Sequence, residues 1–227
     1  MRDKKSEFSK NMKQHIKDRL RREGINNFTK ILMDIRQKYK ENILKFGIKD
    51  AEQSWKPFKG NMLEDVILEY IVEELRAMGL EVIKGATLDK ADRNLTECLS
   101  KVKRNIVVDF GEFGMHLPDA DLVIYDPKKC KPIAIVSSKA SLRERVAQTG
   151  YWNIKLKNSP VTKNIKVFFI TLDEDGDLTL SKPAKKGRAI AEVDTDGTFV
   201  ITTEQIEESN KIKTIARFFE DLKKLKV

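Results

Sequence analysis

The spacing of apolar residues divides the chain into a helical first part and a mixed second part. In 28–46, apolar side chains recur every three or four positions, which is typical of an amphipathic helix with one buried face. The members of this stripe are Phe28, Ile31, Leu32, Ile35, Tyr39 and Ile43. A second helix is predicted over 62–78, with Gly79 placed to end it. The segment 55–61 contains a proline and a glycine, so we expect it to interrupt the helical pattern.

After Gly79 the pattern changes to short apolar runs that are typical of strands. We predict strands over 80–83, 105–110, 119–125, 132–138 and 166–172. A helix is predicted over 141–156. Strands over 189–193 and 198–202 are predicted to form a hairpin, and 203–226 a closing helix. The order therefore predicts an α/β fold, with N-terminal helices followed by a mixed central sheet that is flanked by helices.

The charge balance points to a polyanionic partner. The chain has 44 Lys and Arg against 35 Asp and Glu, which gives a net charge of +9. A basic surface attracts nucleic acid, although a heavy load of Lys and Glu is also typical of thermophile proteins. Residues 1–24 carry nine basic and four acidic residues with few apolar ones. We expect this segment to be a solvated helix or arm that contacts the nucleic acid backbone.

Several other classes of protein are excluded. No stretch approaches the ~20 apolar residues of a membrane span, and no apolar run follows the basic N-terminus as a signal peptide requires. Two cysteines, Cys98 and Cys130, are too few for a disulfide framework and are not spaced as a zinc site. The acidic run 173–177 lacks the spacing of a calcium loop and is predicted to be a turn. We therefore expect a soluble protein of the cytoplasm with no membrane partner.

Glu64 is a charged residue on the apolar face of the predicted helix 62–78. Steps of 100° per residue place the other charged side chains on the solvated face, namely Asp65, Glu69, Glu73 and Arg76. Glu64 instead lies among Ile67, Leu68, Ile71 and Leu75. An ionised carboxylate on such a face is costly unless it meets a cation, a metal or hydrogen-bond donors. Glu64 is therefore either half of a structural salt bridge or part of a polar site.

Three further charged groups are candidates for the same site. The period of two places Asp119 and Asp121 on one side of the predicted strand 119–125. The strand 132–138 runs directly into Lys139, and a short turn joins the two strands. We expect one aspartate to lie near Lys139, unless both charges lie at strand ends in solvent. Phosphodiester hydrolysis requires this set, because carboxylates bind a divalent metal and a cation attends the water or the phosphate.

These residues also resemble a known family. A Pro-Asp pair at Asp119, followed by an apolar strand that ends in Lys139, resembles the PD-(D/E)xK nuclease superfamily. The run Val-Ser-Ser-Lys-Ala-Ser-Leu-Arg-Glu-Arg over 136–145 is similar to type II restriction endonucleases of the branch that recognises CCGG or CCNGG. The resemblance covers Glu64 and about 115–157. It implies a restriction-endonuclease-like fold with an N-terminal helical extension, and Mg²⁺-dependent cleavage of double-stranded DNA.

The resemblance also implies roles by position. Asp119, with Asp121 as the alternative, and Glu64 would bind Mg²⁺, and Lys139 would lie near the attacking water and the scissile phosphate. We favour Asp119, because it is the aspartate of the Pro-Asp pair. The residue two before Lys139 is acidic in much of the superfamily but is Ser137 here. The second metal-binding carboxylate is therefore unassigned, with Asp119 and Asp121 together, or Glu64, as the candidates.

In the CCGG branch the missing carboxylate lies about thirteen residues further along the helix. Trp152 occupies that position here and cannot bind a metal. Recognition of the site is implied for the triplet after Lys139: Arg143 and Arg145 would read guanines and Glu144 a cytosine. This agrees with chemistry, since arginine bonds guanine O6 and N7 and a carboxylate accepts from cytosine N4. The alternative is a cluster of charges on a solvated helix.

The sequence thus predicts a type II restriction endonuclease that cuts a palindromic site with a CC/GG core. A palindrome that is read by one short motif implies a homodimer, and dimers could pair into tetramers. We expect residues 1–60 to form an N-terminal helical region for dimerisation or DNA clamping, and residues 61–227 to form the catalytic domain. Two alternatives are a structure-specific nuclease, such as a junction resolvase or repair nuclease, and a non-catalytic DNA-binding protein with a degenerate nuclease fold.

Overall fold

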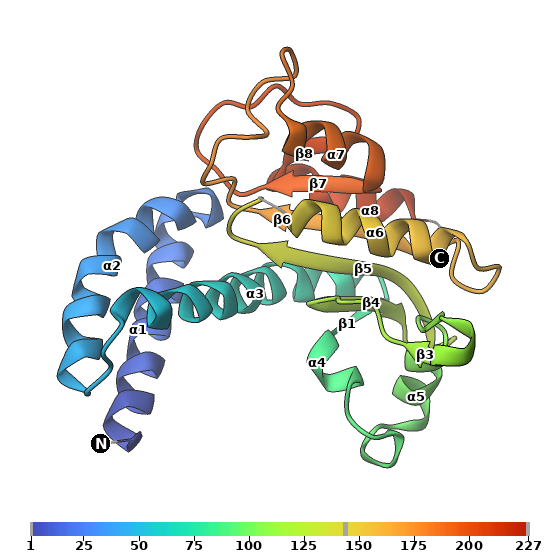
Figure 1. Cartoon of the computed structure of the whole chain (residues 1–227), viewed down its shortest axis with the longest axis horizontal. Coiled ribbons are helices and arrows are strands. Elements are labelled where there is room, and N and C mark those ends of the chain that lie inside the picture. Colours follow the sequence, from blue (N-terminus) through green and yellow to red (C-terminus); the bar gives the residue numbers. More distant parts are fainter. Residues whose placement is uncertain (1, 143–144, 226–227) are drawn as a thin grey trace.

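The computed structural model describes residues 2–142 and 145–225. The chain begins with three helices and a short 3-10 turn: α1 (Arg2–Glu23), η1 (Ile25–Asn27), α2 (Phe28–Lys45) and α3 (Ala51–Ala77). In Figure 1, α1 and α2 stand to one side of the sheet, and α3 extends from them across it. Among the described helices, none is long and apolar enough to cross a membrane.

The centre of the fold is a six-stranded mixed sheet. In spatial order its strands are β1 (Glu81–Lys84), β4 (Leu122–Asp126), β5 (Lys131–Lys139), β6 (Lys166–Thr171), β7 (Gly197–Val200) and β8 (Ile212–Thr214). The pairs β1–β4 and β4–β5 are antiparallel, whereas the pairs from β5 to β8 are parallel. Because Lys139 pairs with Thr171, β5 and β6 end at the same edge of the sheet.

The remaining elements connect the strands or close the chain. They are α4 (Gly85–Leu88), η2 (Asp92–Asn94), α5 (Glu97–Arg104), α6 (Arg145–Lys157), α7 (Lys186–Asp194), η4 (Ile215–Arg217) and α8 (Phe218–Lys224). The segment predicted as a strand over 105–110 instead forms part of a small separate hairpin: β2 (Val108–Asp109), η3 (Gly111–Phe113) and β3 (Met115–His116).

Alternating side chains of the strands build a core on both faces of the sheet. On one face, Leu122 and Val136 join a buried cluster that includes residues of α1, α2, α3 and α8. On the other face, Val123 and Ile135 pack with residues of α5 and α6, and Phe169 packs against α6 and α7. The sheet therefore lies between two helical layers, which confirms the predicted mixed sheet flanked by helices.

The amphipathic helix over 28–46 is confirmed as α2, and all six residues of its predicted apolar stripe are buried. The predicted interruption at 55–61 is wrong, because α3 is continuous and contains Pro57. Aromatic packing stabilises this segment, since the Tyr39 ring lies 5.1 Å from Trp55 and 4.5 Å from Phe58, measured between ring centroids. A helix without a break therefore joins the N-terminal helices to the sheet across the expected 60/61 boundary.

Gly79 ends α3 as predicted. Its φ is 75°, a left-handed conformation that favours glycine. The N–H of Gly79 donates to Arg76 at 2.9 Å, and the N–H of Leu80 donates to Leu75 at 2.9 Å. This pattern is a Schellman motif, which satisfies two of the last carbonyls and turns the chain into β1.

The predicted hairpin near the C-terminus is wrong, although its second strand, predicted over 198–202, exists as β7. Residues 189–193 belong to helix α7, and β7 pairs in parallel with β6 rather than forming a hairpin. Asp196 was expected in the turn of the hairpin. It instead precedes β7, and its carboxylate accepts the N–H of Val167 in β6 at 2.9 Å. The predicted closing helix over 203–226 is reduced to α8, since the edge strand β8 uses part of that segment. The acidic run 173–177 does form a turn, with Asp173 accepting N–H groups of Asp177 and Leu178.

The first helix is not a free arm. Met12 and Ile16 of α1 are buried in the core. Several basic residues of α1 pair with acidic residues of the chain: Lys13 with Asp65, Lys17 and Arg21 with Glu69, and Arg19 with Glu23 and Asp34. Asp65 therefore lies under α1 rather than on a solvated face, whereas Glu69 is exposed as predicted. These ion pairs reduce the charge that α1 can offer to a polyanion.

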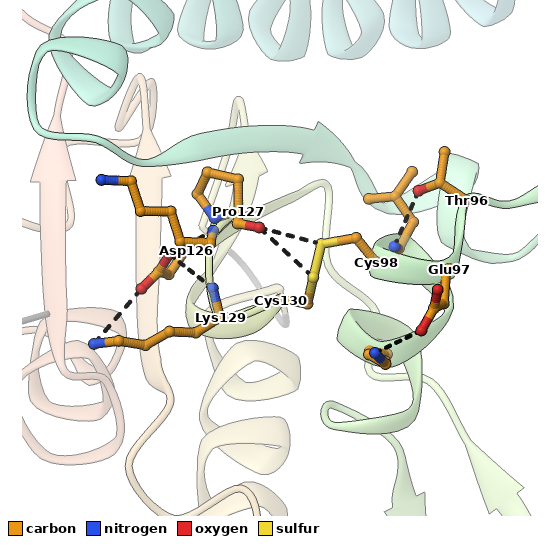
Figure 2. The surroundings of a disulfide bond; sticks show 10 residues. Thr96, Glu97, Cys98, Asp126, Pro127, Lys129 and Cys130 are labelled. Atoms are coloured by element: carbon orange, nitrogen blue, oxygen red, sulfur yellow. Dashed lines mark hydrogen bonds and ion pairs between the residues drawn. A yellow bond between two sulfur atoms is a disulfide. The ribbon is translucent and has the colours of Figure 1, made fainter.

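The two cysteines form a disulfide, which the sequence interpretation did not include. Figure 2 shows Cys98 of α5 joined to Cys130, the last residue of the turn between β4 and β5. Both Sγ atoms lie 3.6 Å from the carbonyl oxygen of Pro127. The buried Asp126 carboxylate accepts the N–H groups of Lys128 and Lys129, at 2.8 and 3.1 Å. The turn is therefore fixed both by its own hydrogen bonds and by the covalent link to α5.

Candidate active site

Asp121 and Lys139 form the centre of the candidate site. The Nζ of Lys139 lies 2.9 and 3.1 Å from the two carboxylate oxygens of Asp121. Ser138 donates to the same carboxylate from its backbone N–H at 2.6 Å and from its hydroxyl at 3.1 Å. Strand pairing explains this arrangement, because the N–H of Asp121 donates to Val136, next to the end of β5. The Asp121 carboxylate is therefore oriented by three donors from β5.

Glu64 reaches the same region from α3. Its carboxylate lies 2.9 Å from the Nζ of Lys84, the last residue of β1. The Lys84 Nζ also lies 2.6 Å from Asp65, which in turn is 2.7 Å from the Nζ of Lys13 on α1. The carboxylate on the apolar face of α3 thus meets a cation, as its cost of burial requires. Lys84 lies within a row of alternating charges from α1 to the candidate site.

The charges in this row are stabilised in their ionised forms. Burial opposes ionisation of Asp65, but hydrogen bonds from Lys13 and Lys84 outweigh it and the pKa of Asp65 lies below its ordinary value. Burial also opposes the charge on Lys84, but hydrogen bonds to Asp65 and Glu64 outweigh it and the pKa of Lys84 lies above its ordinary value. Both groups are therefore charged at neutral pH, and Lys84 offers Glu64 a permanent cation.

One cleft is lined by Asp121, Lys139 and Glu64, and we call it the active-site cleft. Its volume is about 580 Å³, and its lining includes Glu64, Asp121, Ser138, Lys139 and Arg145. The carboxylates and the ammonium are partly accessible, with exposed side-chain fractions of 21% for Glu64, 18% for Asp121 and 20% for Lys139. The structure therefore brings together residues that lie far apart in the sequence, at the edge where β5 and β6 end.

Gly85 fixes the approach of β1 to the Asp121 segment. Its N–H donates to the carbonyl of Asp121 at 2.8 Å, and a Cβ at this position would overlap the carbonyl oxygen of Ala120. Only glycine allows this contact without a shift of the backbone that carries Asp121. Lys84, which pairs with Glu64, directly precedes Gly85, whose N–H holds the Asp121 carbonyl.

Gly85→Ala is expected to reduce the free energy of unfolding by about 1–3 kcal/mol, because the added methyl group has no space. Urea denaturation measures this change. Gly60→Ala is the matched control, since no heavy atom lies within 4 Å of its added Cβ and alanine favours a helix. Its stability is expected to be equal to or higher than that of the parent chain. Equal stability of both variants would contradict the close approach at Gly85.

Asp119 lies apart from the active-site cleft. It precedes the start of β4, and its carboxylate accepts from the side chain of Gln148 on α6 at 2.7 Å. It lines a separate cavity of about 210 Å³ together with Trp152. The structure therefore places Asp121, and not Asp119, beside Lys139. The two aspartates diverge because β4 begins only at Leu122, so the period of two does not apply to Asp119.

Arg145 is exposed and lines the active-site cleft at the start of α6. Its N–H donates to the carbonyl of Leu142 at 2.7 Å. Arg143 and Glu144, the other two residues of the predicted recognition triplet, lie outside the described residues. The place of Arg145 beside Asp121 and Lys139 puts at least one arginine of the triplet next to the candidate chemistry.

Two features in or near the cleft were not anticipated from the sequence. Lys84 had no visible partner, because its contact with Glu64 requires the packing of β1 against α3. Glu174 and Asp175 of the acidic turn line the cleft, and Glu174 pairs with Lys59 of α3 at 2.6 Å. The turn directly follows β6, so the parallel pairing of β5 and β6 brings it near Lys139. The sequence alone could not have placed the turn beside Lys139, because it does not show that β5 and β6 pair in parallel.

The oxygen donors of the cleft suit a hard divalent cation. Asp121 and Glu64 are carboxylates that line one cleft and are partly accessible. Mg²⁺ commonly uses one or two protein carboxylates, several waters and substrate phosphates. Within 2–142 and 145–225, no group of three or more His, Cys, Asp or Glu side chains is arranged to bind a metal. The residues present therefore fit an ion that takes most of its ligands from water and substrate.

Comparison with known proteins decides the family. The model of the family described as BsaWI restriction endonuclease type 2 matches residues 98–224, which is more than half of the chain. The chain belongs to the BsaWI family of type II restriction endonucleases. It is therefore a site-specific DNA nuclease by family, and the matched range contains Asp121, Lys139 and Arg145.

Curated relatives and a solved structure agree with membership in the BsaWI family. The chain is 40% identical over 215 residues to "Putative type II restriction enzyme MjaVIP" from Methanocaldococcus jannaschii, covering 87% of this chain and 92% of that protein. It is 45% identical over 87 residues to "Probable type II restriction enzyme HpyAORF263P" from Helicobacter pylori, covering 38% of this chain and 45% of that protein. A solved complex of restriction endonuclease PspGI with substrate DNA has the same fold, with a TM-score of 0.56, 14% identity and coverage of 96% and 92% of the two chains.

Proposed function

We propose that this member of the BsaWI family is a Mg²⁺-dependent type II restriction endonuclease. It hydrolyses phosphodiester bonds of double-stranded DNA at a palindromic site with a CC/GG core. The observation that carries the proposal is the convergence of Asp121, Glu64 and Lys139 on one cleft. Asp121 directly precedes β4, Glu64 belongs to α3 and Lys139 ends β5, so three separate elements bring charged groups to this cleft.

In the proposed mechanism, Asp121 and Glu64 would hold the metal. Mg²⁺ held there would supply a Lewis acid for the phosphate and would lower the pKa of a bound water. Ser138 orients the Asp121 carboxylate through two hydrogen bonds, and Lys84 orients Glu64. The Lys139 ammonium stabilises the negative charge that develops on the phosphate during attack. Asp119, which the sequence favoured, has no role at the metal in this proposal.

The proposed recognition of the CC/GG core uses the triplet that follows Lys139. Arg143 and Arg145 would bond guanines through O6 and N7, and Glu144 would accept from cytosine N4. The exposed place of Arg145 on the rim of the active-site cleft supports this role. A base-reading arginine beside the catalytic lysine fits an enzyme that cuts within or next to the sequence that it reads.

A palindromic site implies a two-fold symmetric homodimer. We propose residues 1–60 as the region for dimerisation or DNA clamping and residues 61–227 as the catalytic domain, and pairing of dimers into tetramers stays open. The position of α1 and α2 to one side of the sheet in Figure 1 supports this division. Met33 and Leu44 of α2 are large apolar side chains that are exposed in the single chain. Such exposure is expected of residues that an interface between two copies would cover.

Digestion of long DNA with Mg²⁺ tests the function. We expect discrete, reproducible fragments whose sequenced ends share one palindrome with a CC/GG core. Cleavage that follows DNA shape rather than sequence would instead identify a structure-specific nuclease. Tight DNA binding without cleavage in Mg²⁺ or Mn²⁺ would identify a non-catalytic DNA-binding protein.

A further inference from the structure

An ion pair joins two walls of the active-site cleft. On one wall is Lys59 of α3, and on the other is Glu174, in the acidic turn that follows β6. The Nζ of Lys59 lies 2.9 and 2.6 Å from the two carboxylate oxygens of Glu174. The two residues are 115 positions apart in the sequence, and both line the cleft. The pair therefore spans part of the space that the proposed function requires DNA to enter.

The charges that line the active-site cleft cancel. The described lining residues include four cations and four anions: Lys56, Lys59, Lys139 and Arg145, and Glu64, Asp121, Glu174 and Asp175. Binding of the DNA backbone is favoured by cations that face the phosphates. Glu64 and Asp121 are the proposed metal ligands, whereas Glu174 and Asp175 have no role in the proposed mechanism. These last two carboxylates therefore oppose the approach of a phosphate.

The turn that carries Glu174 is fixed without Lys59. The Asp173 carboxylate accepts the N–H groups of Asp177 and Leu178, at 2.9 Å each. Neither of these hydrogen bonds uses the Glu174 side chain. The Glu174 carboxylate can therefore leave Lys59 while the turn keeps its shape.

The helix that carries Lys59 is equally independent of the pair. Trp55 and Phe58 stack with their ring centroids 5.5 Å apart, and both are buried in the core. Gly60, the next residue after Lys59, lines the cleft and has no heavy atom within 4 Å of an added Cβ. Packing inside the chain therefore does not require glycine at this position, although glycine weakens a helix. A ligand that approaches α3 closely beside Lys59 is a physical reason for a residue without a side chain.

A phosphate is chemically able to replace Glu174 on Lys59. The side chains of Lys59 and Glu174 are 18% and 27% exposed, so solvent reaches the pair. An ion pair of this kind contributes little, because water and salt screen it. A DNA phosphate carries the same charge as a carboxylate, and its binding also releases counterions that are condensed on the duplex. The exchange of one anion for the other keeps the Lys59 ammonium paired throughout.

We propose that Lys59 binds a phosphate of the DNA in the active-site cleft, and that Glu174 holds this lysine until the DNA displaces it. The inference rests on the proposed function, because it takes the active-site cleft as the place where DNA binds. Glu174 is then an internal competitor of the phosphate. Lys59 contributes to affinity without reading the sequence, since it contacts only the backbone.

A double-mutant cycle of Lys59→Gln and Glu174→Gln tests the exchange. The affinity of the full chain for a labelled duplex is measured in EDTA over a range of salt concentrations. Lys59→Gln is expected to reduce the slope of log K against log salt by about 0.9, the loss of one phosphate contact. Its affinity is expected to fall about twofold to threefold in the parent chain, but about fivefold to tenfold in the Glu174→Gln background. The costs differ because only the parent breaks an ion pair before Lys59 meets the phosphate.

Control variants separate the exchange from general effects of charge. Lys223→Gln and Glu74→Gln break an ion pair of the same residue types between α8 and α3, 3.1 Å long and outside the active-site cleft. Both are expected to keep the salt slope of the parent. Lys59→Arg retains the charge and is also expected to keep the slope. Far-UV circular dichroism establishes that each variant is folded.

The inference is overturned if Lys59→Gln keeps the salt slope of the parent. It is also overturned if Lys59→Gln costs at least as much affinity in the parent as in the Glu174→Gln background. Digestion with Mg²⁺ tests the proposed function separately, because the binding assay contains no metal. A chain that cleaves DNA but shows neither effect of Lys59→Gln retains the proposed function and loses only this inference. A chain that shows both effects but does not cleave retains the phosphate contact of Lys59 and loses the nuclease function.

Discussion

Asp121→Asn is expected to lower the rate of Mg²⁺-dependent DNA cleavage by about 10³-fold, whereas Asp119→Asn is expected to leave it nearly unchanged. Asp121 lies 2.9 Å from the Nζ of Lys139 and lines the active-site cleft with Glu64. Asp119 bonds Gln148 of α6 and lines a different cavity. Removal of one preorganised electrostatic group from an active site typically costs 10²–10³ in rate, and a lost metal ligand adds to that cost.

The pair of variants is matched in chemistry, because each replaces one carboxylate by an amide of the same shape. Cleavage rates at saturating enzyme, measured on one DNA substrate, compare them directly. Circular dichroism and thermal unfolding of both variants establish that each is folded. A larger loss of rate in Asp119→Asn than in Asp121→Asn would return the metal to the aspartate of the Pro-Asp pair and would contradict the geometry of the cleft.

Opening the Cys98–Cys130 disulfide is expected to reduce the free energy of unfolding by about 3–4 kcal/mol. The two cysteines are 32 positions apart, and a cross-link that closes a loop of this length restricts the unfolded chain. Urea denaturation of the oxidised chain, of the reduced chain and of Cys98→Ser/Cys130→Ser measures the effect. The reduced chain and the double variant should agree within about 1 kcal/mol if the covalent link is the cause.

The double variant also serves as the control for the reductant, since its stability should not change when a thiol is added. Oxidised and reduced parent chains of equal stability would contradict the disulfide of Figure 2. The disulfide also ties α5 to the turn between β4 and β5, so reduction is expected to affect that end of the sheet. The cleavage chemistry lies at the other end of β5 and is expected to be less affected.

Local sequence patterns predicted the elements whose apolar residues follow a regular spacing along the chain. The stripe from Phe28 to Ile43 fills one buried face of α2, and Gly79 ends α3 with a left-handed φ. The strands over 119–125, 132–138 and 166–172 exist as β4, β5 and β6, because continuous apolar runs favour burial on both faces of a sheet. These features depend on neighbours within a few residues, which is why the sequence was sufficient.

Elements that depend on distant contacts were not predictable in the same way. Pro57 lies inside α3 because Trp55 and Phe58 pack against Tyr39, a contact between two helices. Residues 189–193 form a short, mostly apolar run that resembles a strand, but they belong to α7, and the following β7 pairs with β6. Local propensity cannot decide between a hairpin and a parallel crossover when the partner strand is far away in the sequence.

The candidate site was predictable in composition but not in detail. Glu64, Asp121, Lys139 and Arg145 were all named from the sequence, and the structure brings them to one cleft. The order of preference between the two aspartates did not follow from periodicity, because the strand begins one residue after Asp121. The +9 charge of the chain is also distributed differently from the expectation, since Lys13 and Lys17 of α1 form ion pairs with acidic residues of α3.

Cleavage and DNA binding by Lys139→Ala, determined in the same preparation, test the proposed active site. The Lys139 ammonium lies beside Asp121 in the active-site cleft, where it is proposed to stabilise the charge of the reacting phosphate. The variant is expected to bind DNA with nearly the affinity of the parent but to show no Mg²⁺-dependent cleavage. Lys155→Ala, on α6, is the control and is expected to cleave normally. Full cleavage by Lys139→Ala would contradict the assigned active site.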